Sequence, residues 1–224
     1  MGAELGLKKD LKVISPEEIK HLLEPGELGV ILELTVTDPK TGKVSEHRVM
    51  KSRSFVQQFL QLLFAHMANA TSVTTVSARD TGNTLRNVYR VYGGAGTIYG
   101  MDCNALATET THGIIVGTDN TAPTISDHDL LVPIAHGVAG GQMQYSAMAF
   151  GAPGSDATTS QITLTRNFTA NVGGITVNEI GLYVRCNEGV SARYFMTIRD
   201  VIAGGIVVPA GQTLTVNYRE QGVI

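Results

Sequence analysis

The last third of the sequence alternates apolar and polar residues, and this period of two restricts the fold more than any other feature. Four β-prone runs follow one another between turn-forming residues: QITLTRNFTA, ITVNEIGLYV, ARYFMTIRDV and QTLTVNYRE. In three of them apolar residues recur on one face (Ile162, Leu164 and Phe168; Tyr194, Met196 and Ile198; Leu214, Val216 and Tyr218). Half-buried antiparallel strands of this kind are typical of β-sandwiches. We therefore expect a mainly β protein built around an antiparallel, jelly-roll-like β-sandwich.

The composition agrees with a turn-rich β protein and narrows the classes of partner. The 224 residues include 25 glycines and no tryptophan, and 17% are charged. A net charge of −3 gives no general attraction to nucleic acid or to an anionic membrane. No apolar run approaches the ~18 residues of a membrane-spanning helix, and the N-terminus lacks the apolar core of a secretory signal. We expect synthesis in a cytoplasm, no membrane or nucleic-acid partner, and reduced thiols at Cys103 and Cys186.

Two elements are predicted in the N-terminal part. Ser15-Pro16-Glu17-Glu18 combines a capping hydroxyl, a first-turn proline and a carboxylate three positions after the serine. This combination predicts a short helix that ends at Pro25-Gly26. The alternating stretch GVILELTVTD, the turn PKTG and the stretch KVSEHRVMK predict a β-hairpin. We assign residues 1–53 to an N-terminal arm of helix and hairpin, and residues 54–224 to a domain with a second helix and the β-sandwich.

The segment SFVQQFLQLLFAHMAN, residues 54–69, has a helical period instead. Its apolar residues recur at intervals of three and four, which predicts one buried helix face: Phe55, Val56, Phe59, Leu60, Leu63 and Met67. Ser54 is the expected N-cap. Leu62 and Phe64 widen the apolar surface beyond one stripe, so we expect this helix to be deeply buried or packed against a partner chain. The interface candidates are Phe55, Phe59, Leu62 and Phe64.

The run ITVNEIGLYV contains a break in its alternation. Apolar residues occupy positions 175 and 177, and then positions 180, 182 and 184, so the phase slips by one residue at Asn178-Glu179. A β-bulge or a strand that changes sheets produces such a slip. Glu179 could be a catalytic acid or base, or a structural residue whose carboxylate accepts hydrogen bonds from unpaired backbone amides of the sheet. We favour the structural role, because no second carboxylate or histidine lies nearby at a suggestive spacing.

Two glycine-containing motifs are better explained as turns than as catalytic sites. Asp80-Thr81-Gly82 is the tripeptide of aspartic proteases, but polar residues surround it, which is typical of a surface turn. Gly93-Gly94-Ala95-Gly96 follows a predicted strand. It lacks the Lys-Ser/Thr of a phosphate-binding loop, and no helix begins after it.

Several other residues are of types found in functional sites, but their spacing in the sequence fits no known site. Asp127-His128-Asp129, with His112 and His136 in the same region, contains metal-ligand types but fits no metal-site template. Nothing local marks Cys103 as an activated thiol. Basic and aromatic residues alternate at Arg86, Tyr89, Arg90 and Tyr92, as in proteins that bind single-stranded nucleic acid. Two arginines in an acidic chain are weak support for such binding, so we favour an ordinary strand with an exposed polar face. We therefore predict no catalytic residues, no metal site and no cofactor, and we do not expect an enzyme.

Four segments resemble virion proteins of tailed bacteriophages. GIIVGTDNTAPTISDHDLL, residues 113–131, is similar to their G-T-G-x-T-A-P-x-x-x-D-x-x-L segment, with Asp119-Asn120 in place of the usual glycine. NFTANVGGITVNEIGLYVR at 167–185 and RDVIAGGIVVPAGQTLTVNYRE at 199–220 resemble their sheet with the pattern I-x-V-x-E-I-G-L-Y followed by P-x-G-x-x-L-x-V-x-Y. The helix at 54–67 is similar to one that precedes this sheet in such proteins.

This resemblance implies a structural component of the virion that forms a symmetric homo-oligomer and contacts other virion proteins. It implies that Glu179, Gly181 and Tyr183 are structural residues of the sheet. Tail, neck, baseplate and head-surface proteins all use such domains, so the position in the particle stays open. The alternative is a receptor- or carbohydrate-binding module of a phage fibre, which would use loops at one end of the sandwich. A hydrolase is a third, weaker possibility, because no catalytic set assembles in the sequence.

Overall fold

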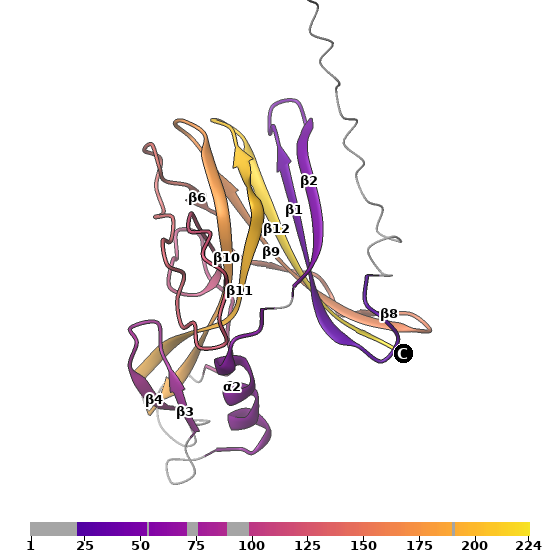
Figure 1. Ribbon diagram of the computed structural model, residues 1–224, viewed down its shortest axis with the longest axis vertical. Coiled ribbons are helices and arrows are strands. Elements are labelled where there is room, and N and C mark those ends of the chain that lie inside the picture. The colour runs from indigo at the N-terminus through magenta and orange to yellow at the C-terminus, as the bar shows by residue number, and fades with distance from the viewer. Residues whose placement is uncertain (1–21, 53, 71–75, 89–98, 190) are drawn as a thin grey trace, which may run out of the picture.

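The computed structural model describes residues 22–52, 54–70, 76–88, 99–189 and 191–224 (Figure 1). Strands account for 52% of the described residues and helix for 6%, and the sheets are antiparallel. The prediction of a mainly β, antiparallel protein is therefore confirmed. The short helix expected before Pro25 falls almost entirely on residues outside the described ranges. In the part of the chain that is described, no helix has the length and apolar character needed to cross a membrane.

The larger sheet has the strand order β2-β1-β12-β9-β6. Its main strands are β1 (Leu28–Thr37), β2 (Val44–Ser52), β9 (Thr159–Thr169) and β12 (Thr213–Val223), and three short strands pair with β9: β6 (Gln144–Tyr145), β7 (Ala149–Phe150) and β8 (Gly154–Ser155). The predicted hairpin is β1–β2. Strand β1 pairs with β12 along its whole length, from Leu28 opposite Gly222 to Thr37 opposite Thr213. The hairpin is thus part of the larger sheet, so the predicted boundary at 53/54 does not separate an arm from the sandwich.

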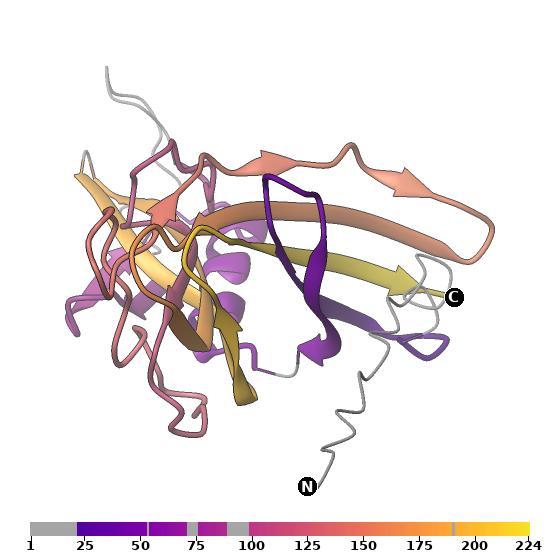
Figure 2. The ribbon, with the colours of Figure 1, turned by 90° about the horizontal axis from the view of Figure 1, so that it is seen from above.

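The smaller sheet packs against the larger one. It contains β5 (Gly113–Gly117), β10 (Ile175–Glu188) and β11 (Ser191–Val208) in the order β11-β10-β5. One apolar core includes residues of both sheets, among them Leu32, Leu34, Val216, Ile180 and Ile198. The Tyr218 hydroxyl on β12 also donates to the Asp200 carboxylate on β11, at 3.0 Å. Figure 2 shows the larger sheet extending past the smaller one toward the C-terminus.

Strands β10 and β11 are buried on both faces along part of their length. A second apolar cluster lies on the far side of this strand pair and brings together Leu62, Ala78, Val88, Val184, Cys186 and Phe195. It is covered by α2 (Gln57–Met67) and by the hairpin of β3 (Val76–Arg79) and β4 (Leu85–Val88) (Figure 1). The expectation of one polar face is therefore wrong for β11, because helix and hairpin cover the face that would otherwise meet solvent.

The predicted helix is present but begins two residues later than expected. Its N-cap is Val56, which makes no capping side-chain bond, so the assignment of Ser54 as the N-cap is wrong. Residues 54–56 instead pair with the edge of β11. The Arg199 amide donates to the Ser54 carbonyl at 3.1 Å, and the Val56 amide donates to the Thr197 carbonyl at 3.1 Å. Backbone pairing with a strand edge has replaced side-chain capping.

The faces of α2 differ from the predicted ones. Leu62 is fully buried in the second cluster, so it is not available as an interface residue. Phe55 and Phe59 are half-buried, with ring centroids 4.4 Å apart. Phe64 is exposed, at 62%, together with Leu60 at 66% and Met67 at 79%. These three side chains, spaced by four and three positions, form one exposed apolar face that we call the α2 stripe.

Candidate functional site

The predicted β-bulge at Asn178-Glu179 is present as a register shift, but its extra residues lie in the neighbouring strand β11. Val177 lies opposite Ile206, and Glu179 lies opposite Val201, so two steps along β10 match five along β11. The excess chain turns at Gly204 and Gly205, whose φ angles of +74° and +63° favour glycine. A side chain at Gly205 would collide with that of Asn178. Asn178 itself donates to the Thr118 carbonyl at 2.6 Å.

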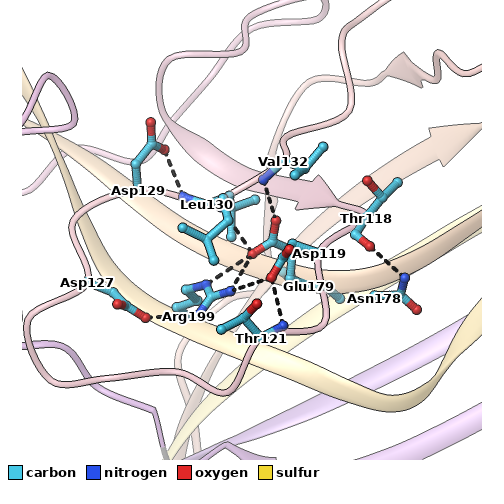
Figure 3. Close-up of polar contacts among 12 residues, drawn as sticks. Thr118, Asp119, Thr121, Asp127, Asp129, Leu130, Val132, Asn178, Glu179 and Arg199 are labelled. Carbon is cyan, nitrogen blue, oxygen red and sulfur yellow. Dashed lines mark hydrogen bonds and ion pairs between the residues drawn. The ribbon is translucent and has the colours of Figure 1, made fainter.

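The carboxylate of Glu179 is completely buried and makes four hydrogen bonds (Figure 3). Oε1 accepts the Val132 amide at 2.9 Å, and Oε2 accepts the Leu131 amide at 3.3 Å. Oε2 also accepts the Nε and Nη2 groups of Arg199, at 3.0 and 2.9 Å. The expected bonds from backbone amides are thus present. The amides belong to the loop between β5 and β6, however, and not to the sheet itself.

Arg199 on β11 extends this contact into an ion cluster. Its side chain is 1% exposed and lies between Glu179 and two loop carboxylates. Nη1 donates to Asp127 at 2.9 Å, and Nη2 lies 3.6 Å from Asp119. Burial opposes ionisation of Asp127, but hydrogen bonds from Thr124 and Arg199 hold its pKa below the ordinary value. We call Glu179, Arg199, Asp127 and Asp119 the ion cluster.

Gly181 and Tyr183 complete the attachment of the loop. The Tyr183 hydroxyl donates to the Asp129 carboxylate and accepts the Leu130 amide, both at 2.7 Å. A Cβ atom at Gly181 would lie 2.5 Å from the Tyr183 ring and 3.3 Å from Leu130. Gly181 therefore leaves the space in which the tyrosine ring lies over the strand. Burial raises the pKa of Asp129 despite its hydrogen bond from Tyr183.

This arrangement fastens the segment 118–133 to the smaller sheet. Glu179 and Arg199 are almost inaccessible to solvent, and both carboxylate oxygens and all three guanidinium nitrogens of the pair are engaged. A general acid or base has to reach its substrate. The geometry therefore favours the structural role for Glu179 over the catalytic one. It also supplies the reason for the spacing of Glu179, Gly181 and Tyr183, which alternate on one face of β10.

The other motifs weighed in the sequence lie apart from this cluster. Asp80-Thr81-Gly82 forms the predicted turn, between β3 and β4, but Asp80 is buried and not at the surface. Its carboxylate accepts the Thr84 amide at 2.9 Å and Arg86 Nε at 2.6 Å. The glycine run 93–96 and the residues Tyr89, Arg90 and Tyr92 lie outside the described ranges.

The histidines and Cys103 do not gather into a site. Asp127 and Asp129 engage different partners, Arg199 and Tyr183. Among the described residues, no three histidine, cysteine, aspartate or glutamate side chains are grouped as metal ligands. Burial raises the pKa of the Cys103 thiol to about 12, which leaves it protonated at neutral pH.

A second buried arginine, Arg166 on β9, was missed in the sequence. It is 0% exposed and stacks on the Tyr145 ring, 4.9 Å from its centroid. Its five N–H groups donate at 2.6–3.3 Å to five backbone carbonyls, those of Leu106, Glu109, His112, Ile114 and Ser146. The sequence could have predicted its burial, because Arg166 lies between Leu164 and Phe168 on the face that the alternation assigns to the core.

Substitution of Gly181 by alanine should destabilise the fold through overpacking. The added methyl group would meet the Tyr183 ring at 2.5 Å, so the ring has to move and its bonds to Asp129 and Leu130 weaken. We expect a loss of about 1–3 kcal/mol in the free energy of unfolding, measured by urea denaturation. Gly154→Ala is the matched control, because a Cβ atom there meets nothing within 4 Å. Equal stability of the two variants would contradict the proposed role of Gly181.

In comparisons with known proteins, no family model, no curated protein and no solved structure matches this chain. The likeness of residues 113–131 and 167–185 to phage virion proteins therefore stays a prediction.

Proposed function

We propose that this chain is a structural component of a bacteriophage virion that assembles as a symmetric homo-oligomer and contacts other virion proteins. One observation carries the proposal: the two segments with phage-like sequence motifs, 113–131 and 167–185, form a single unit. Strand β5 pairs with β10, with Gly117 opposite Glu179 and Gly113 opposite Tyr183. Asp127 and Asp129 of the first segment then contact Arg199 and Tyr183. The residues of both segments thus hold one loop against the smaller sheet. A rigid surface of this kind suits a structural protein.

The α2 stripe supports assembly with further copies. Leu60, Phe64 and Met67 are each more than 60% exposed on one side of the helix. The exposed Ile125 lies beside the first turn, because the Gln57 amide donates to the Ile125 carbonyl at 2.9 Å. Contiguous exposed apolar side chains of this kind are typical of protein interfaces. Strand β2, at the end of the sheet order, offers a second contact through its outer edge.

The proposed assembly predicts that the purified protein is larger than its 23.8 kDa protomer. Leu60→Glu combined with Phe64→Glu places two carboxylates on the α2 stripe, where burial against another chain would be strongly unfavourable. We expect native mass spectrometry to show oligomers of the unmodified protein and mainly protomers of the double variant. Val172→Glu, an exposed apolar residue in the loop between β9 and β10, is the control and should keep the oligomers. A protomer-only spectrum of the unmodified protein at micromolar concentration would contradict the proposed assembly.

The virion assignment is tested on particles themselves. Antibodies against the purified protein, labelled with gold, should decorate phage particles from the source culture at repeated, symmetric positions in electron micrographs. Mass spectrometry of the same purified particles should detect its peptides in many copies per particle. Particles that contain none of this protein would overturn the proposal, whatever the oligomeric state in solution.

A further inference from the structure

A pocket of about 320 Å³ opens where β6 pairs with β9. Its volume is at the lower end of the range of about 300–1,000 Å³ that is usual for small-molecule sites. The residues that shape it include Thr108, His136, Gln144, Tyr145, Asn167 and Thr169. The polar groups of these side chains are amides, hydroxyls and an imidazole, and no aspartate, glutamate, lysine or arginine is among the described residues that line the pocket.

His136 offers this pocket a hydrogen-bond donor. Its Nδ1 accepts the Tyr145 amide at 3.1 Å, so Nδ1 carries no proton. The neutral imidazole therefore has its proton on Nε2, which can donate to a ligand. The ring is fixed by stacking on Tyr145, with centroids 6.1 Å apart and an angle of 24° between the planes.

Two side-chain amides add further donors. Asn167 Oδ1 accepts the Thr215 hydroxyl at 2.8 Å, and Gln144 Oε1 accepts Asn171 Nδ2 at 3.1 Å. The carbonyl oxygens of both amides are therefore occupied, while Asn167 Nδ2 and Gln144 Nε2 remain able to donate. The pocket thus brings together neutral donors that match the oxygen atoms of an uncharged, hydroxyl-rich ligand.

Thr108 at the rim has a strained backbone. Its φ angle is +73°, a left-handed conformation that β-branched residues rarely adopt. The Thr108 amide donates to the Tyr145 carbonyl at 3.2 Å, which holds the rim against β6. Strained residues of this kind gather at ligand-binding sites, where the surrounding structure maintains them. This observation is independent of the polar character of the wall.

We propose that this pocket binds one neutral saccharide unit. Phosphate or another anion would also accept hydrogen bonds from these donors, but no exposed cation lines the pocket among the described residues. The guanidinium of Arg166, behind Tyr145, is fully buried and bonded to carbonyls through all its N–H groups. The site does not depend on the proposed virion role, so either proposal can fail without the other.

The test titrates isotope-labelled protein with methyl glucoside, methyl galactoside, methyl mannoside and N-acetylglucosamine, followed by NMR. At least one sugar should shift the side-chain amide signals of Gln144 and Asn167 in a saturable way. Asn167→Ala and His136→Ala should each raise Kd about tenfold, the effect of one lost hydrogen bond. Asn120→Ala, an exposed asparagine in another loop, should bind as the unmodified protein does.

Three results would overturn the saccharide site. The first is the absence of a saturable shift with all four sugars at millimolar concentration. The second is binding that survives both pocket substitutions unchanged. The third is a response of the same signals to inorganic phosphate but to none of the sugars, which would make the pocket an anion site.

Discussion

Glu179→Ala should lower the free energy of unfolding by about 3–5 kcal/mol, because it removes one partner of a buried ion pair. The Val132 and Leu131 amides would lose their acceptor, and Arg199 would lose the carboxylate that accepts both its Nε and Nη2 groups. Asp127 and Asp119 still neutralise part of the arginine charge, so we expect a folded but destabilised protein. Urea denaturation measures the loss directly.

Glu179→Gln should cost less than Glu179→Ala. The amide oxygen can still accept from Arg199 and Leu131, but the amide nitrogen then faces the Val132 N–H group, which is also a donor. Glu46→Gln is the control. Its partly exposed pair with Arg48 should contribute no more than about 1 kcal/mol. A catalytic Glu179 would behave differently, since both variants would lose an activity while stability stayed level or rose. Unchanged stability in both variants would refute the fastening role.

Arg166→Met should have an effect of similar size, about 3–5 kcal/mol, although Arg166 pairs with no carboxylate. The methionine would fill part of the space but leave five backbone carbonyls without their donor. Burial lowers the pKa of this guanidinium to about 10, so it stays charged at neutral pH. The five carbonyl dipoles stabilise that charge in place of an anion. Urea denaturation of the variant measures the loss in the free energy of unfolding.

Arg166→Lys and Arg193→Met make this test specific. Lysine restores the charge and at most three donors. The free energy of unfolding of Arg166→Lys should therefore lie between those of Arg166→Met and the unmodified protein. Arg193 is one-third exposed and pairs with Glu188, so its replacement by methionine should change stability little. If Arg166→Met were as mild as Arg193→Met, the bonds to the carbonyls would contribute little to the fold.

The strands could be predicted from the sequence because alternation is a local property. The same local signal revealed the phase slip at Glu179, and it also contained Arg166, at the inward position between Leu164 and Phe168. The partner of Glu179 could not be found this way. Arg199 lies on the neighbouring strand, opposite Gly181 and 20 positions from Glu179, and the acceptors Asp127 and Asp119 come from a distant loop. Contacts between side chains that are so far apart in the sequence do not affect the local alternation of apolar and polar residues, so this alternation cannot predict them.

The errors have the same origin. Ser54 has the chemistry of an N-cap, but the chain at 54–56 pairs with β11, and this pairing depends on where β11 lies. The burial of both faces of β10 and β11 likewise depends on α2 and the β3–β4 hairpin, which cover residues such as Val184 and Phe195. Local patterns identify strands and helices, whereas the environment of each face is decided by tertiary packing.

The position of β1 between β2 and β12 determines when this protein can finish folding. Glu33 on β1 bonds Asn217 on β12, a residue 184 positions further along the chain. A ribosome makes β1 and β2 early, but their neighbour in the sheet, residues 213–223, emerges much later. Until then Leu32 and Leu34 have no core to enter, and the edge of β1 is open to other nascent chains. Closure of the larger sheet is therefore a late, slow step of folding, and a chain cut short before β12 leaves an aggregation-prone hairpin.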